Sequence, residues 1–320
     1  MPSQHHRNPL LTRRQLLGRG VLGWSAGLGL TGSGIGAAQG YAPAGLSRVV
    51  ARLPGLQRPL SVAVLSDLHY GPYIRERQVA GWVNLTLSAR PDLILVLGDF
   101  CDVKLGSALP APLLRQLARL TAPLGVYGVW GNHDYGSFGR YERRVIGEIR
   151  SDWADVRAAF QQALAEGGLN ILTNQGLSVR PDLWLGGVDD LSWGQPDAGA
   201  ALRGAPTQAA QLLMVHEPDD LMGLAAVPAW RPDGLAVCGH THGGQIRLPV
   251  LGALVVPSSY GQRFAQGWVR GEAMGGRPGA LGYVSRGLGL SGVPFRNMCP
   301  PEVVLFALSP GRSEHFWTGY

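Results

Sequence analysis

The sequence predicts a layered α/β fold, and two observations lead to it. Short, nearly uninterrupted apolar runs recur from residue 60 onwards, and segments with apolar residues at helical spacing lie between them. Strands that read as continuous apolar runs are buried on both faces of a sheet, and strands that alternate with helices build layered α/β folds. With 45% apolar and 16% charged residues among 320, the composition excludes a disordered protein.

The expected elements follow one another along a single domain of about residues 50–310. Helices are expected where apolar side chains recur every three or four residues, as at Val79, Trp82 and Val83, and Gly167-Gly168 ends the last of them. The helices are expected at 77–89, 113–120 and 153–166. The strands are expected at 60–65, 93–97, 125–130, 177–179, 183–185, 212–215, 235–237, 281–284 and 303–308, with 177–179 and 183–185 paired.

Polar side chains follow five of these strands directly. They are Asp67 and His69, Asp99 and Asp102, Asn132 and His133, His216, and His240 and His242. In open α/β sheets, ligands bind at the carboxyl ends of the strands, so we expect these side chains to converge. Carboxylate, amide oxygen and imidazole suit Mn, Fe or Zn ions, and the absence of cysteine from the set argues against a structural thiolate zinc site.

The motifs around these residues resemble a known family. In order, they are Asp67-x-His69, Gly98-Asp99-x-x-Asp102, Gly131-Asn132-His133-Asp134, His216 and Gly239-His240-Thr241-His242. Together they resemble the calcineurin-like metallophosphoesterase superfamily. The C-terminal stretches 283–289, 294–296 and 299–302 resemble its YkuE-like branch, whose members are in part Tat-exported phosphodiesterases. The resemblance implies a four-layer α/β/β/α sandwich with a dinuclear metal site at the C-terminal ends of the strands.

The resemblance also implies which residues hold the metal ions. The first ion would be held by Asp67, His69 and His242, the second by Asn132, His216 and His240, and Asp99 would bridge the two. The ions would be divalent or trivalent, and the sequence does not choose among Mn, Fe and Zn. The implied reaction is hydrolysis of a phosphodiester or pyrophosphate bond by in-line attack of a metal-bridging hydroxide.

Further residues would act on the substrate itself. By the same resemblance, His133 would protonate the leaving group as general acid, and Asp102 would orient His133, with Asp134 as the alternative partner. Arg286 and Arg296 could contact a substrate phosphate, and the competing interpretation is that both arginines are structural. The sequence does not name the substrate or the oligomeric state.

Residues 1–44 are expected to be a Tat-type signal and linker, and residues 45–320 the metallophosphoesterase domain. Arg13-Arg14 is followed by Leu16-Leu17 and then by an uncharged, moderately apolar segment, which is typical of a twin-arginine signal. The competing interpretation is an Arg-containing tail with a Gly-rich linker. The sequence leaves open whether the leader is cleaved or kept as an anchor. We expect export through the Tat translocase to the periplasm or cell envelope.

The net charge of +6 is concentrated in this leader. Residues 1–40 contain four arginines and no acid, so the remainder carries 24 basic and 22 acidic residues, and no nucleic-acid partner is expected. The expected partner is a phosphate-ester small molecule or an envelope substrate, with possible membrane or cell-wall association. Two alternatives are a UDP-diacylglucosamine pyrophosphohydrolase of lipid A synthesis and an inactive, metal-stabilised envelope-binding module.

Overall fold

The structure, a computed structural model, describes residues 43–106, 108–141, 149–270 and 281–311. The chain divides into two units after Ile35, and every described residue belongs to the second. Residues 1–42 of the predicted leader lie outside the described residues, so the leader stays a prediction. Among the helices that the structure describes, none has the length and apolar character needed to cross a membrane.

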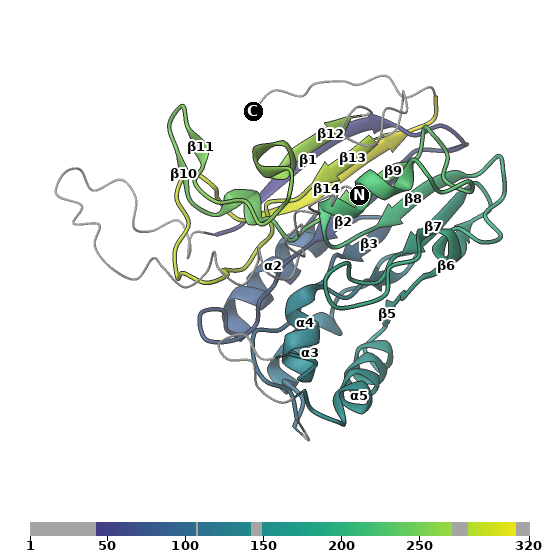
Figure 1. The fold of residues 1–320 in the computed structure, drawn as a ribbon. Helices are drawn as coiled ribbons and strands as arrows, with labels where there is room; N and C mark the ends of the chain where they lie inside the picture. Colours follow the sequence, from purple (N-terminus) through teal and green to yellow (C-terminus); the bar gives the residue numbers. More distant parts are fainter. Residues whose placement is uncertain (1–42, 107, 142–148, 271–280, 312–320) are drawn as a thin grey trace, which may run out of the picture. The chain divides into compact units, whose positions relative to one another are not determined.

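Two six-stranded sheets form the described part of the chain (Figure 1). The first has the order β1 (Gly45–Arg52), β14 (Glu302–Ser309), β2 (Leu60–Leu65), β3 (Leu93–Val96), β4 (Val126–Gly128) and β5 (Leu169–Ile171). The second has the order β12 (Gly267–Arg270), β13 (Leu281–Val284), β9 (Leu235–Cys238), β8 (Ala210–Met214), β7 (Leu183–Gly187) and β6 (Gln175–Arg180). The central strands β2, β3 and β4 run parallel, as do β7, β8, β9 and β13.

Helices accompany both sheets. Between the strands of the first sheet, the chain forms the helices α2 (Glu76–Ser88), α3 (Ala111–Leu117), α4 (Asn132–Phe138) and α5 (Trp153–Glu166). The second has the short α6 (Ala198–Ala201), α7 (Leu221–Leu224) and the 3-10 turns η2 (Pro218–Asp220), η3 (His242–Gly244) and η4 (Gly261–Phe264). A small hairpin, β10 (Arg247–Leu248) and β11 (Gly252–Ala253), pairs antiparallel outside both sheets (Figure 1).

Side-chain alternation along the strands assigns each residue to one of three core layers. In β3, Leu93 and Leu95 belong to the core between the sheets, whereas Ile94 and Val96 pack in the core that contains the helix residue Val83. Strand β9 alternates in the same way between the inner core and a third core on the outer side of the second sheet. Successive strand residues point to opposite faces, so these three cores separate four layers. The expected α/β/β/α sandwich is confirmed.

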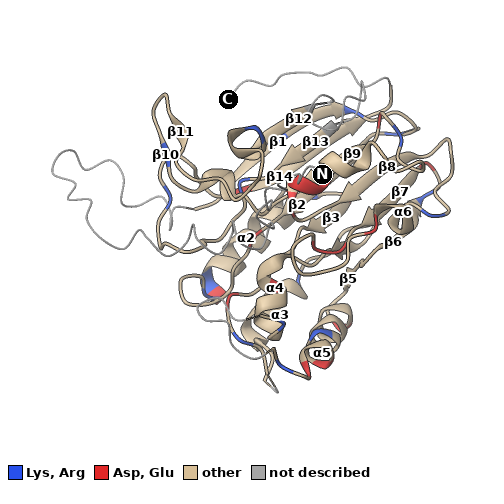
Figure 2. Cartoon of the chain, viewed as in Figure 1, with Lys and Arg blue, Asp and Glu red and all other residues tan. Residues whose placement is uncertain are grey.

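The central strands β2, β3, β4, β7, β8 and β9 contain no charged residue, which explains why their apolar runs predicted them (Figure 2). Helix α5 and strand β13 have the predicted bounds, and β6 and β7 pair as expected. Strands β1, β5 and β12 and the β10–β11 hairpin were not predicted. Strand β1 is an edge strand with a mixed exposure pattern, and β10 and β11 are too short to show a period of two. Cys101, Cys238 and Cys299 are buried free thiols.

We expect Phe160→Ala to lower the free energy of unfolding by about 3–5 kcal/mol, because truncating a fully buried ring leaves a cavity. Phe160 of α5 has no exposed surface and stacks on Trp130 with ring centroids 6.0 Å apart. Urea denaturation measures the change. The matched control is Phe295→Ala, because Phe295 is 38% exposed and its truncation should cost less than about 1 kcal/mol. Equal losses for the two variants would contradict the assigned packing.

Candidate metal centre

The polar side chains predicted to form the site follow the carboxyl ends of five strands. The first sheet supplies Asp67 and His69 after β2, Asp99 and Asp102 after β3, and Asn132 and His133 after β4. The second sheet supplies His216 after β8, and His240 and His242 after β9. The distances given below show that the predicted ligands from both sheets converge, as the parallel strand order requires.

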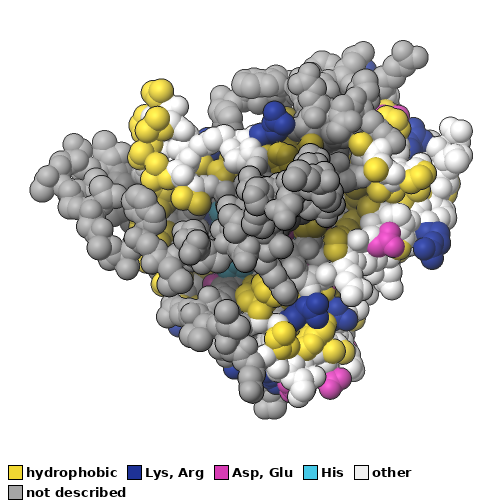
Figure 3. Space-filling view, viewed as in Figure 1, with side chains coloured by type: hydrophobic (Ala, Val, Ile, Leu, Met, Phe, Trp, Pro, Cys, Tyr) yellow, Lys and Arg dark blue, Asp and Glu magenta, His cyan; other side chains and the backbone are white. Residues whose placement is uncertain are grey.

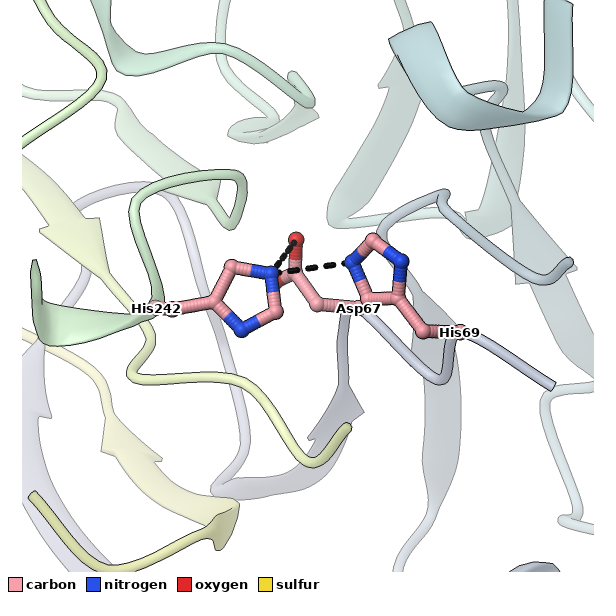
Figure 4. Close-up of side chains that lie close together, drawn as sticks. All are labelled: Asp67, His69 and His242. Carbon is pink, nitrogen blue, oxygen red and sulfur yellow. Dashed lines mark hydrogen bonds and ion pairs between the residues drawn. The ribbon is translucent and has the colours of Figure 1, made fainter. Parts of the chain in front are cut away.

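The first cluster contains Asp67, His69 and His242 (Figure 4). The Nε2 atoms of the two histidines face each other at 2.9 Å, and Asp67 Oδ1 lies 3.6 Å from His242 Nε2. All three side chains are buried. Burial, the neighbouring His69 and the Arg296 guanidinium lower the pKa of His242 well below its usual range. His242 is therefore neutral, the form in which imidazole binds a metal.

The second cluster contains Asn132, His216 and His240. Asn132 Oδ1 lies 3.1 Å from His216 Nε2 and 3.0 Å from His240 Nδ1. His216 Nδ1 lies 2.6 Å from the carbonyl oxygen of Leu97 and donates to it, because a carbonyl can only accept. Burial opposes protonation of His216, but the neighbouring Asp99 carboxylate outweighs it and raises the pKa of the ring well above its usual range. A metal ion bound at Nε2 would take the place of that proton. The contact of Nδ1 with the Leu97 carbonyl fixes the ring, as such contacts do in most histidine metal sites.

Asp99 lies between the two clusters. Its Oδ2 is 3.4 Å from Nε2 of His69 and 3.4 Å from Nε2 of His216, and its side chain is buried. Burial alone would raise the pKa of Asp99, but the neighbouring histidines outweigh it and hold the pKa below its usual range. The ionised carboxylate therefore shares one oxygen between the two groups of nitrogens, which is the position of a bridging ligand.

These donors fit metal ions. Metal–ligand bonds of about 2.0–2.2 Å place two ligands of one ion roughly 3–3.5 Å apart, and the separations of 2.9–3.6 Å agree with that spacing. Imidazole nitrogens and carboxylate oxygens, all of which can offer a lone pair to a metal ion, face one another in a buried site, and a cation satisfies such an arrangement. Oxygen and imidazole donors without thiolate suit Mn, Fe or Zn.

The backbone at the site is strained. Among the described residues, ten that are not glycine have a positive φ, and five of these are predicted ligands: Asp67, His69, Asp99, His240 and His242. The left-handed conformation costs an L residue about 1–2 kcal/mol, and such residues concentrate at functional sites. Gly131 allows the close approach of two loops, because a Cβ there would lie 2.3 Å from Asp99 Oδ1 and 2.7 Å from His216 Cε1.

His133 and Asp102 form a pair at the edge of the ligand clusters. His133 Nδ1 lies 2.9 Å from Asp102 Oδ1, and the two side chains are 16% and 12% exposed. The ring of His133 packs edge-on against that of His69, with centroids 4.4 Å apart. A group that acts on substrate must be reachable, and the partial exposure of His133, which Asn132 and His240 share, meets this condition. Of the two partners that the sequence left open, Asp102 is the one in contact.

Asp134 supports the loop that carries Asp99. Its buried carboxylate accepts hydrogen bonds from the backbone N–H groups of Asp99, Phe100, Cys101 and Gly131, at 2.8–3.2 Å. Burial and the adjacent Asp99 carboxylate raise the pKa of Asp134. Asp134 is the third residue of α4, so its side chain turns back to the start of the helix and across to the Asp99 loop.

The two predicted substrate-binding arginines have protein partners. Arg286 donates to Glu302 and Ser47, which ties β1 and β14 to the segment after β13. Arg296 has no exposed surface, donates to the carbonyl oxygen of Gly289 at 2.7 Å, and places Nη2 3.1 Å from His242 Nδ1. A guanidinium without exposed surface cannot contact a substrate phosphate, so the prediction for Arg296 is wrong. Its contacts fix the ring of His242.

One pair near the site was missed from the sequence. Tyr141 stacks on Trp193 with ring centroids 4.0 Å apart, and its hydroxyl donates to the carbonyl oxygen of Asn132 at 2.7 Å. Burial and the nearby Asp99 and Asp190 carboxylates raise the pKa of Tyr141, so the hydroxyl stays protonated. Neither residue belongs to a recognisable motif, and only the folded chain brings them together.

The family model for calcineurin-like phosphoesterases matches residues 60–244, which is more than half of the chain and includes every predicted ligand. The chain belongs to the calcineurin-like phosphoesterase family. This metallophosphoesterase is 28% identical to the "Uncharacterized metallophosphoesterase YkuE" of Bacillus subtilis over 93% of its own length and 98% of that protein. It is 30% identical to the "Phosphodiesterase YaeI" of Escherichia coli over 78% of its length and 82% of that protein.

A further relative is the bovine "Transmembrane protein with metallophosphoesterase domain", which is 30% identical over 62% of this chain and 43% of that protein. Family membership, together with the clustered ligands, makes the metallophosphoesterase a hydrolase that acts on phosphoester bonds.

We expect Asp134→Asn to destabilise the protein by about 2–4 kcal/mol. One carboxylate oxygen becomes an NH₂ group that cannot accept, so buried backbone N–H groups lose their acceptor at about 1–3 kcal/mol each. The Asp99 loop should also loosen, and metal bound per chain should fall. Urea denaturation and mass-spectrometric metal analysis measure the two effects. Asp155→Asn, an exposed change on α5, is the control that should leave both unchanged.

Proposed function

We propose that this metallophosphoesterase is an exported, dinuclear metal-dependent enzyme that hydrolyses phosphodiester bonds. The observation that carries the proposal is the position of Asp99 Oδ2, 3.4 Å from both histidine groups, beside the partly exposed His133–Asp102 pair. One ion would be held by Asp67, His69 and His242, the second by Asn132, His216 and His240, with Asp99 shared. When bound, two such ions lower the pKa of a coordinated water to near 7 and neutralise phosphoryl charge.

His133 would supply the proton that the leaving group needs. Its Nδ1 is held by Asp102 at 2.9 Å, so the proton available for transfer is the one on Nε2. The Asp102 carboxylate stabilises the imidazolium and fixes the ring plane before the substrate arrives. General acid assistance of this kind accelerates a reaction by about 10²–10⁴-fold. The effect is largest for a leaving group that is unstable as an anion, such as an alkoxide.

The preference for diesters rests on the relative of Escherichia coli, which is named a phosphodiesterase. Hydrolysis of a pyrophosphate bond would follow the same in-line attack, so a pyrophosphate is the alternative substrate that differs least from a diester. The UDP-diacylglucosamine pyrophosphohydrolase alternative requires a substrate on the cytoplasmic face, and the Arg13-Arg14 leader argues against it. The inactive binding module is disfavoured because the ligand clusters, Asp102 and His133 are all in place.

We expect His133→Asn to lower kcat about 10²–10⁴-fold on a phosphodiester with an alkyl leaving group, and about tenfold or less on a p-nitrophenyl diester. A nitrophenolate leaves without protonation, so it bypasses the acid. Steady-state rates of the manganese-loaded enzyme, with metal content measured alongside, test this assignment. Metal content should match the unmodified protein, because His133 lies outside the predicted ligand sets.

The matched control for this experiment is Asp102→Asn, which keeps the ring of His133 and removes only the charge that orients it. Its loss on the alkyl diester should be smaller than that of His133→Asn. Equal losses on both leaving groups, accompanied by loss of metal, would show that His133 supports the metal site and would refute its role as acid.

Export is proposed from the leader alone, with the Tat translocase as partner. We expect the double change Arg13→Lys and Arg14→Lys to retain the protein in the cytoplasm, because a receptor reads the paired arginines. Fractionation of cells that carry a reporter fused after residue 60 measures this. Arg7→Lys is the control that should export normally. Equal export of both forms would contradict a Tat signal, and cytoplasmic retention of the unmodified fusion would revive the lipid A alternative.

A further inference from the structure

Exposed apolar side chains concentrate in one region. Among the described residues, eleven large hydrophobic side chains are exposed, and nine of them lie within residues 248–260 and 293–298. We call these nine the apolar rim: Leu248, Val250, Leu251, Leu254, Val255, Tyr260, Val293, Phe295 and Met298. Figure 3 shows apolar side chains gathered where the β10–β11 hairpin lies in Figure 1. Exposed apolar groups on a monomer are normally scattered, so such a cluster marks an interaction surface.

The two segments of the apolar rim form one surface. Arg247 N donates to the carbonyl oxygen of Asn297 at 3.0 Å, and Asn297 Nδ2 donates to the carbonyl oxygen of Arg247 at 2.6 Å. Gln245 Nε2 also donates to the carbonyl oxygens of Ser291 and Val293, each at 3.0 Å. Gln245 N in turn donates to the carbonyl oxygen of His242, so the rim is tied to the metal-site loop.

The tip of the hairpin is apolar where turn chemistry favours glycine or asparagine. Val250 has a φ of +68° and a relative exposure of 106%. A left-handed conformation is a genuine outlier for a β-branched residue. Leu251, 70% exposed, follows it. The side chain of Val250 is fully exposed, so packing within the protein does not explain why a strained position carries a valine. A contact of this apolar side chain outside the protein would explain it.

The charged residues of the hairpin and of the two rim segments are all arginines. Residues 240–270 contain no Asp or Glu, and they include Arg247 in the hairpin and the exposed Arg263 in η4. Figure 2 shows no acidic residue on the hairpin. Asp219 lies near the rim, where it accepts from Ser258 Oγ and from Ser259 N. An apolar tip flanked by arginines complements a bilayer that contains anionic lipids.

We propose that the apolar rim is a membrane-docking surface that inserts Val250 and Leu251 into the interface of an anionic bilayer. Docking would hold the metal-site loop close to the lipid headgroups, because Gln245 joins the hairpin to His242. A second copy of the chain is a poorer occupant, since a stable dimer buries about 800 Å² on each partner and the tip is a single turn. The inference concerns binding and does not depend on the proposed hydrolysis.

Cosedimentation of the full chain with vesicles tests the proposal. The probes are vesicles of phosphatidylcholine with 30% phosphatidylglycerol and vesicles of phosphatidylcholine alone. We expect binding to the anionic vesicles and at least about a tenfold loss for the double variant Val250→Asn and Leu251→Asn. Asparagine tolerates the left-handed conformation, so the double variant should fold. Arg263→Gln should weaken binding to the anionic vesicles about fivefold and leave binding to the neutral ones unchanged.

The matched control is Ile149→Asn, which removes an exposed apolar side chain outside the rim and should bind like the unmodified chain. The leader is identical in all variants, so binding through residues 1–42 would be equal in all of them. Equal vesicle binding by the double variant and the unmodified chain would overturn the proposal. A change from dimer to monomer in analytical ultracentrifugation, with vesicle binding unchanged, would instead make the rim a contact between copies and overturn it too.

Discussion

The buried Asp99 carboxylate is the constraint on which the site depends. A carboxylate removed from water needs hydrogen-bond donors and a compensating positive charge. The backbone N–H of His133 donates to Asp99 Oδ1 at 2.7 Å, and the imidazole nitrogens of His69 and His216 lie 3.4 Å from Oδ2. These histidines come from different sheets, so the charge of Asp99 is satisfied only when the sandwich is closed. Metal ions between the carboxylate and the imidazoles would complete this compensation, which joins stability of the fold to assembly of the centre.

The local structure around Asp99 serves the same requirement. Asp134 holds the backbone of the Asp99 loop, and the absence of a side chain at Gly131 lets that loop approach the start of α4. Left-handed backbone at five predicted ligands is strain that the surrounding sheets maintain. Loss of metal should therefore loosen these loops first, while the three apolar cores keep the strands in place.

The ligands could be predicted from the sequence because each follows a strand whose apolar run is unambiguous. The resemblance favoured Asp102 as the partner of His133, but the sequence could not exclude Asp134. Both lie within three residues of a ligand, and the direction of two loops decides which one meets His133. The sequence could not choose between a substrate-binding and a structural Arg296, because only the folded chain surrounds its guanidinium with carbonyl oxygens. The hairpin strands were missed because two residues show no periodicity.

Electron paramagnetic resonance of the protein loaded with manganese tests the central claim, that Asp99 joins two metal sites, most directly. The account predicts two Mn²⁺ ions per chain and the spectrum of a magnetically coupled pair. In Asp99→Asn, which removes the bridging charge, the account predicts loss of that coupling. A single ion per chain, or two ions with the six-line spectrum of isolated Mn²⁺ in the unmodified protein, would contradict it.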